Sequence, residues 1–218
     1  MGLGDQLRSS PPKDGKPKRS GIAHSKAYHR FFEGYAEVSV PNPDGKGYRI
    51  QRVYTGNYYR QDLTQGQRIR LRGLYVALFL CIAYLFVSSA ILPLTSNSTW
   101  YAVLPQAVSV PFLFWIVVAF ISYLPAERDM TIADYRSSSL SLRNATLGSA
   151  ICLGITALAT LIFIALHPSD ELLRELLSAG KYLAGGLIAL LMYRIETKVK
   201  YLTIPSQHQP PENSYEIK

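Results

Sequence analysis

Residues Gly73 to Leu94 read GLYVALFLCIAYLFVSSAILPL, an apolar run without a charged side chain. In a helix that rises about 1.5 Å per residue, about 20 such residues cross the hydrocarbon core of a bilayer. The run therefore predicts a membrane-spanning helix over about 73–94. Three further apolar runs predict spans over about 101–124, 144–166 and 176–195. We expect an all-α membrane protein whose core, over residues 67–202, is a four-helix transmembrane bundle.

The charge of the 218-residue chain is low and unevenly placed. Charged residues make up 17% of the sequence, against about 25% in an ordinary soluble domain. None lies between residues 73 and 124, whereas Lys and Arg gather beside the apolar runs and give a net charge of +8. Basic residues at the edge of a membrane attract anionic lipid. We therefore expect the lipid bilayer as a partner, with anionic lipid at the cytoplasmic face, and no nucleic acid.

The segments outside the bundle differ in character. Residues 1–27 are rich in Pro, Gly and Lys, and residues 203–218 are polar with several prolines, so both are predicted to be disordered tails. Residues 28–66 are rich in aromatic side chains and predict a small N-terminal cytoplasmic β-hairpin module. A lone hairpin is marginally stable in water, so it must dock. The alternative docking surfaces for the hairpin are its own aromatic flanks, the membrane surface, the 125–143 loop and a second protein.

The turn of this hairpin is predicted at Asn42-Pro43-Asp44-Gly45. Pro presets a type I turn, and Gly45 can take the left-handed conformation that follows it in a three-residue loop. The resulting register pairs Asn42 with Lys46, Val40 with Tyr48, Val38 with Ile50, and Ala36 with Arg52.

The distribution of Lys and Arg predicts the orientation, because basic loops stay on the cytoplasmic side. The N-terminal region, the 125–143 loop and the segment after residue 195 are basic, while the 95–99 link carries no charge. We expect a multi-pass protein of the plasma membrane with both termini in the cytoplasm.

The membrane segments carry few reactive groups. The first three apolar runs contain no Asp, Glu, His, Lys or Arg in their cores, and their serines have no His or acidic partner at matching depth. Cys81 and Cys152 lie inside apolar runs without metal-ligand spacing. We therefore expect no enzyme, no catalytic or metal-ligating residue and no cofactor.

Lys181 is the exception among the ionisable residues. It snorkels to the interface if the fourth helix starts at 176. It becomes a candidate ion or anionic-ligand site, with Gln106 and Tyr84 as partners, if the helix starts near 172. Gln106, which follows a helix proline, is otherwise a packing residue that satisfies a freed carbonyl. Gly185 and Gly186 are candidate ligand or packing residues, since small side chains let helices approach closely.

Just before the first span, Arg68, Arg70 and Arg72 alternate with apolar residues, and we expect them to contact lipid phosphate. The function predicted from these features is that of a non-enzymatic accessory, scaffold or assembly subunit of a membrane complex. Such a subunit has a protein partner or forms a homo-oligomer. The alternative is an oligomeric transporter or channel component.

Overall fold

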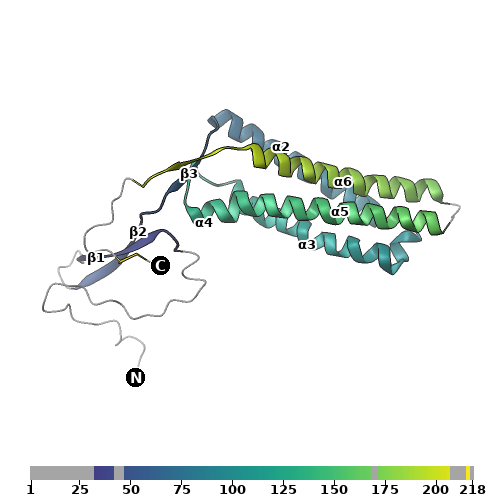
Figure 1. The fold of residues 1–218 in the computed structure, drawn as a ribbon, viewed down its shortest axis with the longest axis horizontal. Coiled ribbons are helices and arrows are strands. Elements are labelled where there is room, and N and C mark those ends of the chain that lie inside the picture. The colour runs from purple at the N-terminus through teal and green to yellow at the C-terminus, as the bar shows by residue number, and fades with distance from the viewer. Residues whose placement is uncertain (1–31, 42–46, 168–170, 207–214, 217–218) are drawn as a thin grey trace, which may run out of the picture. The chain divides into compact units, whose positions relative to one another are not determined.

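The computed structural model describes residues 32–41, 47–167, 171–206 and 215–216. These residues form two compact units (Figure 1). The β unit combines the described residues up to Arg60 with 129–133 and with those from Thr203 onward. The bundle contains residues 61–128 and 134–202. The chain is mostly helical, and the strands form two small sheets.

The bundle consists of four long helices that run side by side (Figure 1). They are α2 (Gln65–Ala90), α3 (Trp100–Tyr123), α5 (Ser141–Leu166) and α6 (Leu172–Lys198). Short helical pieces precede two of them: η2 (Ser96–Ser98) before α3, and α4 (Ile132–Tyr135) with the π-helical turn η3 (Arg136–Leu140) before α5. All four spans are long and apolar enough to cross a membrane, which confirms the predicted set of four apolar helices.

The helices α2, α5 and α6 are longer than their predicted runs, whereas α3 has the predicted length. α2 begins at Gln65 rather than at residue 73, because Thr64 and Gln67 form a capping box in which each side chain meets the other residue's backbone. α6 begins at Leu172 rather than at 176. The chain also becomes helical again at Ile132, inside the segment predicted as a solvated 125–143 loop. Helix ends are set by caps and packing, which hydropathy does not register.

The buried face of each long helix repeats every seven residues. A repeat of seven corresponds to about 3.5 residues per turn, slightly below the about 3.6 of a straight helix. Helices that keep such a face on their neighbours therefore cross at a shallow left-handed angle of about 20°. The buried positions at this spacing are Arg68, Tyr75, Ile82 and Ser89 in α2; Ala102, Ser109, Ile116 and Tyr123 in α3; Leu142, Ser149, Thr156 and Phe163 in α5; and Glu175, Tyr182, Ala189 and Glu196 in α6.

Small residues let α5 approach its neighbours closely. A Cβ added at Gly186 of α6 would lie 3.3 Å from the carbonyl oxygen of Ala150 in α5. A Cβ added at Gly148 of α5 would lie 2.3 Å from the ring of Phe112 in α3. Both glycines are therefore positions of close helix packing within one chain. α2 packs on α6, and it meets α3 through large rings such as the Tyr75–Tyr123 pair.

The β unit is built on the predicted hairpin. The described strands are β1 (Tyr35–Pro41), β2 (Tyr48–Tyr54), β3 (Tyr58–Gln61), β4 (Asp129–Met130), β5 (Tyr201–Ile204) and β6 (Tyr215–Glu216), of which the end of β3 and the start of β5 belong to the bundle. One sheet has the order β2-β1-β6 and the other β4-β3-β5. The predicted disordered tails have different outcomes. Residues 1–27 lie outside the described residues, whereas part of 203–218 forms β5 and β6.

The predicted hairpin register is wrong by one residue. Val38 pairs with Gln51 instead of Ile50, Val40 with Arg49, and Ala36 with Val53. The last pair before the turn is Pro41 with Tyr48, and Gly47, the described residue just before Tyr48, has a positive φ of +85°. The loop is thus longer than the three residues predicted from Asn42-Pro43-Asp44-Gly45, a segment outside the described residues, and the longer loop shifts the pairing.

Tyr54 is the centre of the β unit. Its ring lies 5.0 Å from that of Tyr35 and 4.9 Å from that of Tyr58, measured between centroids. Its hydroxyl donates to the carbonyl of Asn57 and accepts from the backbone N–H of Ile132, at 2.8 and 3.1 Å. The hairpin therefore docks both on its own aromatic flanks and on part of the segment between α3 and α5.

Candidate functional site: a buried carboxylate among hydroxyl groups

Glu196, near the C-terminal end of α6, is 3% exposed and lies among four hydroxyl groups. Its Oε2 accepts hydrogen bonds from Tyr75 at 2.8 Å and from Tyr123 at 3.2 Å. Its Oε1 accepts from Tyr201 at 2.8 Å and from Ser139. These donors come from α2, α3, η3 and the start of β5, so one carboxylate ties together parts of the chain far apart in sequence.

This arrangement satisfies a group that is costly to bury. A carboxylate has about four lone-pair sites, and an ionised group removed from water is tolerated only when it is paired or hydrogen-bonded. The four hydroxyl donors fill those sites, and no cationic side chain of the described residues forms an ion pair with Glu196. Each bond has a charged acceptor, which makes it stronger than a bond between neutral groups. The cluster therefore holds the helix ends together.

The guanidinium of Arg68 is connected to this cluster through an amide. Arg68, which is 6% exposed, donates from Nε to Oε1 of Gln61 at 3.2 Å. Gln61 in turn donates from Nε2 to the hydroxyl of Tyr201 at 2.9 Å. A buried positive charge and a buried negative charge are thus linked through two neutral side chains. Arg68 also donates from Nη2 to the carbonyl of Ala126 at 2.9 Å and from Nη1 to Oε1 of Gln65 at 3.4 Å.

Tyr201 keeps its proton in this environment. Burial and the adjacent Glu196 carboxylate raise the pKa of its phenol above the ordinary value of 10.0. The hydroxyl therefore remains a donor to Glu196 across the physiological pH range.

The serine of the cluster is supplied by the π-helical turn. η3 covers Arg136–Leu140, and both Ser138 and Ser139 are buried there. A π turn inserts one extra residue into the helix, and such turns are frequent at functional sites. Ser138 donates to the backbone carbonyl of Asp134, while Ser139 faces Glu196. Two successive serines of this turn are thus buried, and each has a hydrogen-bond partner.

A second buried glutamate lies at the opposite end of α6. Glu175 is 1% exposed, and its Oε1 accepts from the backbone N–H of Ser96 at 3.1 Å. The Ser96 hydroxyl donates to its other oxygen. The next residue, Asn97, donates to the carbonyl of Ser89 at 3.1 Å, near the end of α2. Glu175 therefore fastens the link between α2 and α3 to α6.

The two glutamates occupy the same buried face, twenty-one residues apart. At about 1.5 Å per residue they are separated by about 31 Å, close to the thickness of a hydrocarbon core. Neither acid was predicted as a site residue, since one ends a predicted linker and the other follows a predicted span. The signal that could have found them is their spacing of three sevens, in line with Tyr182 and Ala189.

Lys181 has a different environment from the one predicted. Because α6 begins at Leu172, Lys181 lies in its third turn. Its Nζ donates to the carbonyl of Ser88 in α2 at 3.4 Å. Tyr84 is 70% exposed and points away from the core, and the half-buried Gln106 forms no side-chain hydrogen bond to any described residue. The structure does not bring these three side chains together.

The other predicted residues fall into two groups. Gly185 and Gly186 are buried, and a Cβ added to either would meet α5. Of the three arginines before the first span, Arg68 and Arg72 donate to the carbonyl of Ala126. Arg70 alone has an exposed side chain.

Among the described residues, no three His, Cys, Asp or Glu side chains form a group that could hold a metal ion. The fold and its two buried acids define the chain as a candidate four-helix membrane protein with a small β unit. Comparison with protein-family models, with curated proteins and with solved structures finds no match to the chain.

Proposed function

We propose that the protein is a non-enzymatic scaffold or assembly subunit of a complex in the plasma membrane, with both termini in the cytoplasm. The observation that carries this proposal is the use made of the buried ionisable groups. Ionisable residues within membrane helices are functional candidates by default. Here Glu196, Glu175 and Arg68 all bond to groups on other parts of the bundle. Their chemistry therefore serves to hold the helices together.

The interior supports the same function. Ile82, Ile116 and Leu153 lie in the core of the bundle and are fully buried or nearly so. Gly185 and Gly186, which would line a pore in an oligomeric channel, are covered by α5 of the same chain. No specific observation favours the channel.

The β unit supplies a folded surface for a partner. Its core is organised around Tyr54, and the hairpin strand β2 is an edge strand of its sheet that carries the exposed Arg49. An edge strand offers unpaired backbone groups that a partner can use. A membrane-anchored unit of this kind fits an assembly role.

The test is purification of the full-length protein from its native membrane in mild detergent, with cross-linking beforehand. We expect a protein partner at fixed stoichiometry that is lost in Arg49→Glu. The matched control is Arg174→Glu, an exposed position at the start of α6. A protein that purifies alone and carries selective ion or solute flux in liposomes would contradict the proposal.

A further inference from the structure

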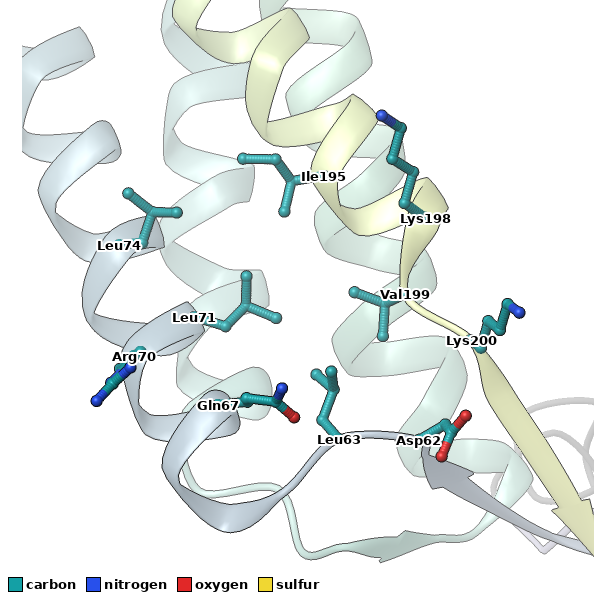
Figure 2. Close-up of a pocket in the computed structure, with 10 residues that line it drawn as sticks. All are labelled: Asp62, Leu63, Gln67, Arg70, Leu71, Leu74, Ile195, Lys198, Val199 and Lys200. Carbon is teal, nitrogen blue, oxygen red and sulfur yellow. The ribbon is translucent and has the colours of Figure 1, made fainter.

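A pocket of about 490 Å³ lies between the start of α2 and the end of α6 (Figure 2). This volume is within the range of about 300–1,000 Å³ that small-molecule sites occupy. Leu71 and Leu74 of α2 point into it, and Ile195 of α6 faces them (Figure 2). Leu63 and Val199, just outside the two helices, complete an apolar floor.

The rim of the pocket is cationic. Arg70, Lys198 and Lys200 line it, all three are exposed, and in the described part of the chain none forms an ion pair. Their charged ends point away from the apolar floor, each in a different direction (Figure 2). Asp62 is the one acid among the lining residues. The rim therefore carries excess positive charge, whereas its floor offers no polar group beyond Gln67.

The floor continues onto the outer surface of the bundle. Leu74 is 44% exposed, and Leu191, one turn before Ile195 on α6, is 48% exposed. An alkyl chain that enters the pocket can thus leave it along the apolar outer face of α2 and α6. A soluble anion would use the rim but not this floor. A ligand with an anionic head and a long alkyl chain uses both.

We propose that this pocket binds one anionic phospholipid. The anionic head group lies at the cationic rim formed by Arg70, Lys198 and Lys200, and one acyl chain covers Leu71, Leu74 and Ile195. Arg68 and Arg72 take no part, since their guanidinium groups bond the carbonyl of Ala126. This lipid site rests on the membrane location given in the proposed function, and it does not require a protein partner.

The test measures lipid retention by the full-length protein in mild detergent. Native mass spectrometry is recorded after titration with phosphatidylglycerol and, separately, with phosphatidylcholine. We expect one phosphatidylglycerol per chain, bound far more tightly than phosphatidylcholine. At about fivefold per cation, the triple variant R70Q/K198Q/K200Q should lose on the order of a hundredfold in affinity for phosphatidylglycerol. Leu74→Gln should weaken both lipids without removing the preference for the anionic one.

The control is R128Q/R174Q/R194Q, which removes the same charge from exposed positions outside the pocket. It should bind like the wild type, and the melting temperature of every variant reports its folding. Equal affinity for the two lipids, or equal loss in both triple variants, would overturn the proposal. So would full competition by inorganic phosphate. Extraction of the protein from membranes at high pH would instead contradict the membrane location.

Discussion

The hydroxyl of Tyr75 donates a 2.8 Å hydrogen bond to Oε2 of Glu196, which joins two buried side chains 121 residues apart in the chain. Replacement of Tyr75 by Phe removes this donor and leaves the ring in place. A hydrogen bond to a charged group contributes about 1.5–3 kcal/mol. We expect a loss of that size in the free energy of unfolding, measured in detergent by denaturant titration.

Tyr84→Phe is the matched control for Tyr75→Phe. Tyr84 lies on the same helix and also carries a phenol, but it is 70% exposed. Its substitution should change the free energy of unfolding by less than about 0.5 kcal/mol, as at ordinary surface positions. Equal losses in the two variants would show that the hydrogen bond from Tyr75 to Glu196 stabilises the fold no more than an exposed hydroxyl does.

Glu175 should tolerate an amide better than an alkyl group. In Glu175→Gln, the remaining oxygen can still accept from the N–H of Ser96. In Glu175→Leu, that buried donor loses its partner, which costs about 1–3 kcal/mol. We expect the Leu variant to unfold at the lower temperature, and Glu171→Gln, at an exposed position just before α6, to unfold like the wild type. Identical melting of the Gln and Leu variants would contradict this role for Glu175.

The two ends of the bundle should behave independently. Tyr75→Phe and Ser96→Ala affect clusters about 31 Å apart along α6. Their effects on the free energy of unfolding should add to within about 0.5 kcal/mol. Tyr75→Phe and Tyr201→Phe share one carboxylate, and their effects should deviate from additivity by more than that. A double-mutant cycle for each pair measures both values, and strong coupling in the first pair would be the contrary result.

Stability should fall at alkaline pH through Tyr201. Its folded-state pKa is raised above 10.0, so the folded protein keeps a proton that the unfolded chain releases. The contribution is fully present below about pH 10 and is lost progressively as the pH rises above it. The difference in melting temperature between wild type and Tyr201→Phe should therefore shrink above pH 10. A difference in melting temperature that stays constant from pH 8 to 11 would contradict this role of Tyr201.

Replacement of two glycines of α5 by alanine should have different effects on stability. In Gly148→Ala the new methyl group would meet the Phe112 ring, and overpacking of this kind costs about 1–3 kcal/mol. A Cβ at Gly154 has nothing within 4 Å, so the better helix propensity of alanine should make Gly154→Ala neutral or slightly stabilising. Thermal unfolding of both variants measures these effects. Adding Phe112→Leu to Gly148→Ala should restore the lost stability.

The polar ends of the helices show why the predicted bounds were too narrow. Hydropathy ended the fourth span before Glu196, because a charged residue is costly in lipid. In the structure that carboxylate is buried among hydroxyl groups and α6 continues to Lys198. The start of α2 could have been predicted from the sequence, since Thr64 and Gln67 have the spacing of a capping box. The hairpin was predictable as a hairpin, but its register depended on a loop whose length the turn residues alone do not determine.

The sequence by itself determined that four helices are long and apolar enough to cross a membrane, because that property depends only on length and composition. It did not reveal which face of each helix is buried. In water the apolar face turns inward, but lipid-facing residues are also apolar, so Leu80 and Ile82 look alike although one is exposed and the other buried. Only the tertiary structure decided that Tyr75, Tyr123 and Tyr201 meet at Glu196. A buried carboxylate is stable only when hydrogen-bond donors surround it, and the fold brings these donors together from separate parts of the chain.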